Sequence, residues 1–398
     1  MIFGYNVEKI RQDFPILSKP VIYLDNACMS LKPRQVIDAV NSYYTDYTAC
    51  AGRSSHSFAS EVENQIAISR NEVKGLINSN NSSEIIFTRN TTEGINLVSN
   101  SIGLKEGDEV IISDKEHNSN LIPWLKCKGI KVIVVESNKD NTFNIENFSK
   151  SFSDRTRLVS VVHTSNLDGV ENPIRDIAKI THKNNALLIV DAAQAVPGKV
   201  VDVKNMDIDF MAFSGHKMLG PTGTGVLYGK KELLEKLDQF IVGGETVVDS
   251  TYKDYKQEKI PMRFEAGLQD YSGIIGLGEA CRYLKRIGLK KIAEHEIKLN
   301  KLVTDSLINE ERIEVLGPKE AQQRSGIFSF NIKGMDMHHV SRILDKSKRI
   351  MTRSGAHCVH SWFNKHHMKG SVRASLYLFN SEEEINMFVE EVKKILNL

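Results

Sequence analysis

Seven short apolar runs, separated by segments with helical periodicity, constrain the fold of this chain more than any other feature. They span residues 84–87, 109–112, 132–135, 158–163, 187–190, 210–213 and 225–228. Continuous apolar runs of this length are typical of strands that are buried on both faces of a parallel sheet. Their alternation with helical segments therefore predicts an α/β fold, in which helices cover both faces of a mostly parallel seven-stranded sheet.

The pattern changes near residue 274, where longer helical segments begin. A long helix is predicted over 289–311, and strands are predicted over 326–330 and 373–377. Ser381 and Glu384 form a capping-box pattern at the start of the last helix. Its apolar stripe, which predicts core packing, consists of Ile385, Phe388, Val389, Val392 and Ile395. We predict a large domain over 18–273 and a smaller α/β domain built from 1–17 and 274–398.

Composition and charge limit the partners of the chain. Its 398 residues carry a formal net charge of +2 without a basic run, so nucleic acid is not an expected ligand. Five cysteines without close pairing argue for a reducing compartment. No apolar run approaches the ~18 residues of a membrane span, and residues 1–9 lack a signal-peptide layout. We expect a cytoplasmic protein without membrane or metal partners, and an exposed hairpin or loop over 252–259 near the mouth of the active site.

Lys217 is the first candidate for chemistry. It ends the segment Ser214-Gly215-His216-Lys217, which follows one apolar run and precedes the glycine-rich stretch 220–225. An ammonium group at the end of a buried strand is costly unless something uses it. An amine in a partly desolvated, phosphate-containing pocket can condense with an aldehyde cofactor. A surface lysine in a glycine loop is the alternative, which the neighbouring residues disfavour.

Asp191 ends another buried run and precedes Lys217 by 217 − 191 = 26 residues, which leaves room for a crossover and one more strand. The carboxyl ends of strands in open α/β sheets face the crevice that binds ligands. An acidic side chain at that place can pair with a protonated pyridine nitrogen. A helix-capping aspartate is the alternative.

Three segments together resemble the core signature of class-V aminotransferase-fold enzymes. They are Val190-Asp191-Ala192-Ala193-Gln194-Ala195, Phe213-Ser214-Gly215-His216-Lys217 and residues 220–228. The resemblance extends from about residue 23 to residue 375 and is strongest to the cysteine desulfurases and selenocysteine lyases of the SufS/CsdA type. It implies the pyridoxal phosphate (PLP)-dependent transferase fold type I, pyridoxal 5′-phosphate as the cofactor, and a homodimer with active sites at the subunit interface.

The resemblance also implies which residues hold the ring of the cofactor. Lys217 would carry it covalently, Asp191 would pair with its pyridine nitrogen, and Gln194 would lie near its ring hydroxyl. His117 would stack on the ring and move protons. Asn166 would lie near the ring and the carboxylate of the substrate.

Three further residues are expected at the phosphate. Thr92 would open a helix whose N-terminal amides face the phosphate, because a helix N-terminus is a natural anion site. Ser214 and His216 would add further contacts to the phosphate.

A second cluster determines which reaction is expected. The segment Arg353-Ser354-Gly355-Ala356-His357-Cys358 resembles the Arg-x-Gly-x-His-Cys loop of the family, and Arg373 follows Cys358 by 373 − 358 = 15 residues. Arg373 can grip a carboxylate with its bidentate fork, and Arg353 is a further substrate-binding candidate. Arg353, His357 and His360 are expected to favour the thiolate of Cys358. An inert buried cysteine is the alternative.

Together with the resemblance, these residues predict a pyridoxal-phosphate-dependent cysteine desulfurase. Its catalytic residues would be Lys217, Cys358, His117 and Arg373. L-Cysteine would become L-alanine, Cys358 would carry a persulfide, and the sulfur would pass to an acceptor protein for iron–sulfur cluster assembly or another sulfur-transfer pathway. Three alternatives stay open: a selenocysteine lyase, a C–S lyase or epimerase on the same scaffold, and a sulfur-carrier or scaffold protein without turnover.

Three positions depart from the family pattern. Leu268 and Gln269 stand where the family has Thr-Pro, and a leucine side chain cannot donate a hydrogen bond to the phosphate of the partner subunit. Either Gln269 or a backbone amide replaces that donor, or the phosphate is held less tightly across the interface. In the segment Gly52-Arg53-Ser54-Ser55-His56, Gly52 stands where the family has an active-site histidine. Cys28 follows Asp25-Asn26-Ala27 where the family usually has alanine, so a second thiol is expected near the substrate.

Overall fold

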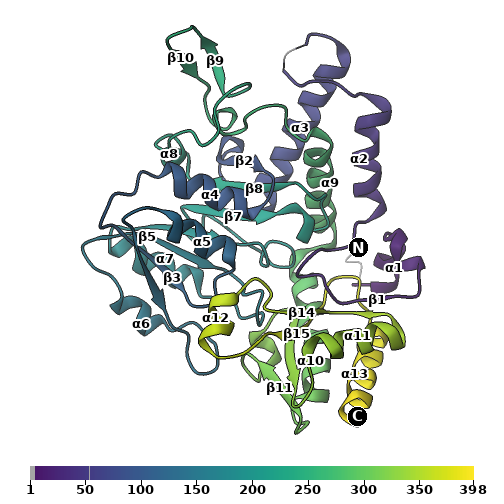
Figure 1. The fold of residues 1–398 in the computed structure, drawn as a ribbon. Helices are drawn as coiled ribbons and strands as arrows, with labels where there is room; N and C mark the ends of the chain where they lie inside the picture. The colour runs from purple at the N-terminus through teal and green to yellow at the C-terminus, as the bar shows by residue number, and fades with distance from the viewer. Residues whose placement is uncertain (1–4, 53) are drawn as a thin grey trace.

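The larger part of the molecule is built on a seven-stranded sheet. The structure, a computed structural model, describes residues 5–52 and 54–398. The strands follow the order β2-β8-β7-β6-β5-β3-β4 (Figure 1), with β8 antiparallel to both of its neighbours and the other neighbours parallel. They are β2 (Ile85–Thr88), β3 (Glu109–Ser113), β4 (Lys131–Val135), β5 (Thr156–Val162), β6 (Leu187–Asp191), β7 (Phe210–Ser214) and β8 (Gly225–Gly229). The predicted mostly parallel seven-stranded sheet is confirmed.

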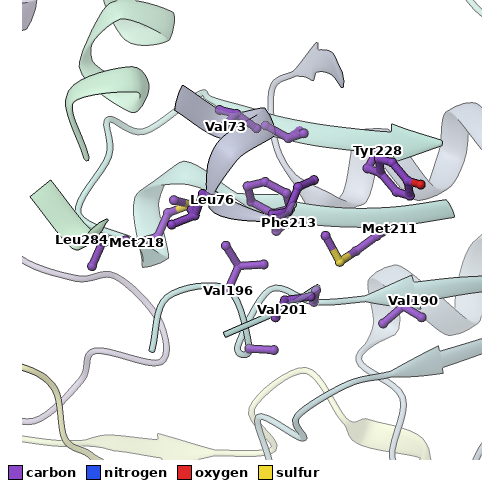
Figure 2. Close-up of a cluster of buried hydrophobic side chains, with 14 of the residues drawn as sticks. Val73, Leu76, Val190, Val196, Val201, Met211, Phe213, Met218, Tyr228 and Leu284 are labelled. Atoms are coloured by element: carbon purple, nitrogen blue, oxygen red, sulfur yellow. The ribbon is translucent and has the colours of Figure 1, made fainter. Parts of the chain in front are cut away.

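Side chains of these strands alternate between two apolar layers. In β7, Phe210 and Ala212 pack in the layer of helices α4 (Thr91–Ser101) and α5 (Asn118–Lys126). Met211 and Phe213 pack in the opposite layer, with α3 (Ser57–Leu76), α7 (Ile174–Lys183) and α9 (Tyr271–Ile287), part of which Figure 2 shows. Because successive strand residues point to opposite faces, helices on both faces explain why the predicted runs are continuously apolar.

The C-terminal part of the chain forms a four-stranded antiparallel sheet, green to yellow in Figure 1. Its strands, in spatial order, are β11 (Ile313–Leu316), β12 (Ile327–Ile332), β15 (Ser371–Ser375) and β14 (Arg353–Gly355). A separate apolar cluster joins it to α10 (Leu289–Leu307), α11 (Met337–Lys348) and α13 (Glu382–Leu396). Helix α13 begins at the predicted capping box and buries its predicted stripe. Helix α10 ends before the predicted residue 311, because the chain turns there to begin β11.

The N-terminal segment contacts the C-terminal part. Strand β1 (Ile22–Tyr23) pairs in parallel with β13 (Ile350–Met351). Arg11 in α1 (Val7–Gln12) forms an ion pair with Glu384 in α13, with 2.8 Å between the nitrogen and the oxygen. The division into 18–273 and 1–17 with 274–398 stays a prediction, and residues 1–4 lie outside the described residues.

The remaining elements connect these layers. They are α2 (Arg34–Asp46), α6 (Ile145–Lys150), α8 (Lys231–Leu234), α12 (His360–Lys365), β9 (Val247–Ser250) and β10 (Tyr255–Gln257). β9 and β10 form an exposed antiparallel hairpin at the top of Figure 1, which confirms an exposed hairpin at 252–259; its predicted position near the mouth of the active site stays a prediction. In the described part of the chain, none of the helices has the length and apolar character needed to span a bilayer.

Candidate active site

One cavity of about 240 Å³ brings together the predicted catalytic, cofactor-binding and substrate-binding residues. Those residues are Thr92, His117, Asn166, Asp191, Gln194, Ser214, His216, Lys217, Arg353, Cys358 and Arg373. Cys28 and His357 line the cavity as well, but His360, which was also expected to assist Cys358, does not; its Nδ1 lies 2.9 Å from Asn118 Nδ2. Lining residues for which no role was predicted are Ala27, Asn90, Thr91, Ser119, Val162 and Ala193. The cavity lies where β6 and β7 end, facing the loop between β14 and β15.

Asp191 ends β6, and Lys217 ends the short 3-10 turn Gly215–Lys217 that follows the neighbouring strand β7. Asp191 is the last residue of β6 and is 3% exposed, and its Oδ1 accepts a hydrogen bond from the Ala193 amide at 3.0 Å. Burial raises the pKa of this carboxyl, although Lys217 and the Ala193 amide lower it. Burial lowers the pKa of Lys217, although the nearby charge of Asp191 acts to raise it. Among the described residues, the Lys217 amine has no hydrogen-bond or ion-pair partner, so it is available to react.

The first turn of α4 opens toward the cavity. Thr91 donates its amide to Ser214 Oγ at 2.9 Å, and Asn90 Oδ1 accepts from the Glu93 amide at 3.0 Å. The Thr92 amide has no such partner among the described residues, and Thr92 Oγ1 lies 2.7 Å from Ser119 Oγ. A helix N-terminus with an unpaired amide favours an anion. This end of the cavity is therefore suited to a phosphate group.

Gly225 lets strand β8 lie directly against this turn. A Cβ atom at Gly225 would lie 2.6 Å from the Cα of Asn90, so only glycine permits the close approach. The placement explains part of the glycine-rich stretch that follows Lys217.

Burial lowers the pKa of all three histidines that line the cavity, His117, His216 and His357, far below 7. Burial, with the charges of Lys217 and both arginines, lowers the pKa of His117 to about 3. Its Nδ1 accepts a hydrogen bond from the Ser119 amide at 3.0 Å, which leaves the proton on Nε2. Burial, with Lys217 and Lys32, lowers the pKa of His216 to about 4. Both imidazoles therefore act through hydrogen bonds or stacking rather than through charge.

Arg353 and Arg373 face each other across β14 and β15. Arg373 is 2% exposed; its Nη1 donates to the Asn166 carbonyl at 2.9 Å, and its Nη2 lies 3.5 Å from Asp25 Oδ1. Its Nε is buried without a hydrogen-bond partner. Like charges on directly opposite strand positions repel each other, so this end of the cavity favours an anionic ligand such as a carboxylate.

The Cys358 loop has a constrained backbone. His357 and Cys358 have φ angles of 48° and 60°, in the left-handed region that non-glycine residues rarely adopt. Asn166 Nδ2 donates to the His357 carbonyl at 2.7 Å, and the Asn118 amide donates to the Cys358 carbonyl at 2.8 Å. These bonds hold the loop, and Cys358 with it, against the cavity.

Two of the three groups expected to assist Cys358 act differently. Burial, with Arg373 and Arg353, lowers the pKa of His357 to about 2, so this ring is neutral and adds no positive charge. Arg353 Nη1 donates a hydrogen bond to Cys28 Sγ at 2.9 Å. The contact of Arg353 is therefore with the other thiol of the cavity.

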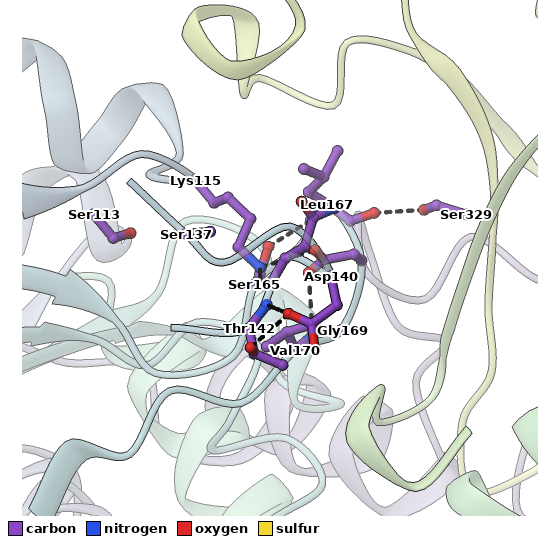
Figure 3. Close-up of polar contacts among 12 residues, drawn as sticks. Ser113, Lys115, Ser137, Asp140, Thr142, Ser165, Leu167, Gly169, Val170 and Ser329 are labelled. Carbon is purple, nitrogen blue, oxygen red and sulfur yellow. Dashed lines mark hydrogen bonds and ion pairs between the residues drawn. The ribbon is translucent and has the colours of Figure 1, made fainter. Parts of the chain in front are cut away.

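Figure 3 shows the contacts that position the Asn166 loop. Ser329 Oγ on β12 donates to the Leu167 carbonyl at 2.5 Å, and the buried Lys115 forms an ion pair with Asp168 at 2.9 Å. Separating a buried ion pair would leave an uncompensated buried charge. These contacts therefore hold the Asn166 loop, whose carbonyl accepts a hydrogen bond from Arg373, in one position.

The side chains of the cavity fit pyridoxal 5′-phosphate. The cofactor needs an unpaired amine, a buried carboxylate for its ring nitrogen and an anion site for its phosphate. Lys217, Asp191 and the first turn of α4 meet these needs in one cavity.

Comparison with known proteins agrees with this assignment. The chain matches the Aminotransferase class-V family over residues 22–388. A probable cysteine desulfurase of Halalkalibacterium halodurans is 39% identical, with 98% of each chain covered. The solved apo structure of a cysteine desulfurase from Thermococcus onnurineus is 36% identical over the whole of both chains, with a TM-score of 0.96. The cysteine desulfurase CsdA of Escherichia coli is 29% identical over 99% of each chain, with a TM-score of 0.93.

Proposed function

The chain belongs to the class-V aminotransferase family and is a pyridoxal-phosphate-dependent enzyme of the cysteine desulfurase type, and we propose that Lys217, Arg373, His117 and Cys358 carry its reaction. The substrate is L-cysteine and the products are L-alanine and a persulfide on Cys358. One observation carries the proposal: an unpaired amine, a carboxylate-binding arginine and a thiol line the same cavity.

Lys217, Asp191 and Gln194 would hold the ring of the cofactor, and Thr92, Ser214 and His216 would hold its phosphate. When bound, the cofactor supplies an aldehyde that joins an amine and a protonated ring that withdraws electrons from Cα. Asp191 keeps that ring protonated because its carboxylate is buried with one hydrogen bond and gains a cationic partner. Leu268, 67% exposed, would not supply the side-chain donor that threonine gives to the phosphate of the partner subunit, so either Gln269 or a backbone amide would replace it or the phosphate would be held less tightly.

The substrate is oriented by its carboxylate. Arg373 grips it with its guanidinium fork, while Asn166 and Asp25 hold Arg373 in place. Arg353 adds a second positive charge from the opposite strand. The carboxylate thereby compensates the repulsion between the two arginines.

The reaction moves one sulfur atom and leaves the redox balance unchanged. The free Lys217 amine takes the Cα proton, and the Cys358 thiolate attacks Sγ of the bound cysteine. An S–S bond forms while the Cβ–S bond breaks, and its electron pair stays on carbon. Lys217 or His117 returns protons to the carbon skeleton. L-Cysteine and a thiol thus become L-alanine and a persulfide.

We also propose that the enzyme is a homodimer and that a separate acceptor protein removes the sulfur, for iron–sulfur cluster assembly or another transfer pathway. Exposed apolar side chains support the dimer: Ile241, Val242 and Leu268 lie on the surface near the hairpin. Apolar groups exposed together are typical of interfaces.

The test measures alanine and sulfide from L-cysteine and from L-selenocysteine, with and without a thiol reductant. Cys358→Ala should keep the cofactor bound and lose sulfide release from L-cysteine. Cys127→Ala is the matched control, because the Cys127 thiol donates hydrogen bonds to the Ser99 and Pro123 carbonyls and does not line the cavity. Full turnover by Cys358→Ala would show that another group attacks the sulfur. A preference for L-selenocysteine would assign the enzyme to the lyases instead.

A further inference from the structure

We propose that Cys28 is a second sulfur-carrying thiol of the cavity, which takes the outer sulfur of the Cys358 persulfide. The inference rests on the proposed function, because it needs a persulfide on Cys358. At the position of Cys28 the family usually has alanine.

The backbone holds Cys28 firmly in the cavity wall. The Cys28 amide donates to the Asp25 carbonyl at 3.1 Å, which closes a turn. The Ala27 amide donates to Ser375 Oγ at 2.9 Å, and Gln194 Nε2 donates to the Ala27 carbonyl at 2.7 Å. The turn is therefore tied both to β15 and to the segment that follows β6, and its thiol has a defined place.

The sulfur of Cys28 has a cationic partner. Arg353 Nη1 donates a hydrogen bond to it at 2.9 Å, and the side chain stays half-buried rather than sealed off. Reactive thiols are found beside a guanidinium in partly exposed sites, whereas thiols in apolar surroundings are inert. Cys281 shows the inert case in this chain, because complete burial raises its pKa to about 12.

Cys28 and Cys358 share one reaction space. Both thiols line the cavity that also holds the buried Lys217 amine. Arg353 begins strand β14 and precedes Cys358 by 358 − 353 = 5 positions. The cavity also holds an unpaired buried nitrogen, Arg373 Nε, which marks where the substrate is held. The second thiol is thus on the wall of the space in which the persulfide forms.

The transfer balances without a further reactant. The Cys28 thiolate attacks the outer sulfur of the Cys358 persulfide, one S–S bond forms as another breaks, and Cys358 leaves as a thiolate. The proton stays on the transferred sulfur, and nothing is oxidised or reduced overall. Cys358 is then free for another turnover while Cys28 stores the sulfur.

The experiment uses the reduced holoenzyme, mixed with a small excess of L-cysteine without another thiol and quenched with an alkylating agent. Alanine is counted per subunit, and the peptides that contain Cys28 and Cys358 are analysed by mass spectrometry. Because each thiol stores one sulfur, the wild type should form about two equivalents of alanine and Cys28→Ser about one. Serine still accepts a hydrogen bond from Arg353, and Cys127→Ser should match the wild type.

The outcomes separate the two proposals. A persulfide on both peptides of the wild type, and none on Cys28 in Cys358→Ala, supports the transfer. A persulfide on Cys358 alone overturns it and leaves the desulfurase reaction intact. A Cys28–Cys358 disulfide with released sulfide, or a Cys28 persulfide in Cys358→Ala, also overturns it. No alanine from the wild type refutes the proposed function itself. The wild-type peptides decide the matter even if Cys28→Ser fails to fold.

Discussion

Arg373→Lys removes the guanidinium fork at the carboxylate end of the cavity and keeps its positive charge. In the structure, Nη1 is bonded to the Asn166 carbonyl at 2.9 Å, Nη2 lies 3.5 Å from Asp25, and Nε has no partner. A lysine has one nitrogen, so it cannot keep the Asn166 contact and also bind both oxygens of a carboxylate. The variant should lose at least one hydrogen bond to a charged group.

Such a bond is worth about 1.5–3 kcal/mol, which corresponds to about a 10- to 150-fold loss in kcat/KM. The assay measures L-alanine formed from L-cysteine and L-alanine methyl ester formed from L-cysteine methyl ester, a substrate that lacks the charged carboxylate. The wild type should strongly prefer the acid, and Arg373→Lys should lose most of that preference. Arg155→Lys is the control, because Arg155 is an exposed arginine paired with Glu109 at the start of β3, and neither residue lines the cavity.

Cofactor absorbance and the melting temperature verify that Arg373→Lys is folded and loaded. The assignment fails if the loaded variant stays within about threefold of the wild type in kcat/KM and keeps the same preference for the acid over the ester.

Three further changes test other parts of the structure. Burial raises the pKa of Glu296 from 4.5 to about 8. Between these values the folded chain keeps a proton that the unfolded chain releases, so the free energy of unfolding falls as pH rises through that window. Glu296→Gln should make the melting temperature less dependent on pH there, and an unchanged slope would refute this. Gly225→Ala adds a Cβ 2.6 Å from the Asn90 Cα. The resulting strain of about 1–3 kcal/mol should weaken cofactor binding in a titration with pyridoxal 5′-phosphate. Gly244→Ala, whose Cβ meets nothing within 4 Å, should bind the cofactor normally in the same titration. Leu268→Glu, at a position that is 67% exposed, should shift the proposed dimer toward monomer in light scattering; an unchanged mass would exclude Leu268 from the interface.

Much of the fold and most of the cavity could be predicted from the sequence. The strands were recognisable because burial on both faces makes a short run continuously apolar, as Phe210–Ser214 shows. The ends of parallel strands meet at one edge of a sheet, so Asp191 and Lys217 could be expected to lie close together.

The contacts between distant segments could not be predicted from residue patterns. Asp25 lies 348 residues from its partner Arg373, and Cys28 lies 325 residues from Arg353. No local pattern records such pairs, because tertiary packing alone brings them together. The left-handed backbone at His357 and Cys358 left no signal either, since neither residue type favours it. The neutral state of His357 follows from its burial, which the motif does not reveal.

The opposed arginines on β14 and β15 have a consequence for how a turnover ends. L-Alanine keeps the carboxylate of L-cysteine, so a clamp that recognises that group holds the departing molecule as firmly as the arriving one. Uniform binding of this kind cannot drive the reaction forward. The part of the cavity that contacts the substrate sulfur must therefore distinguish the two amino acids. Free alanine should compete with cysteine for the same arginine pair.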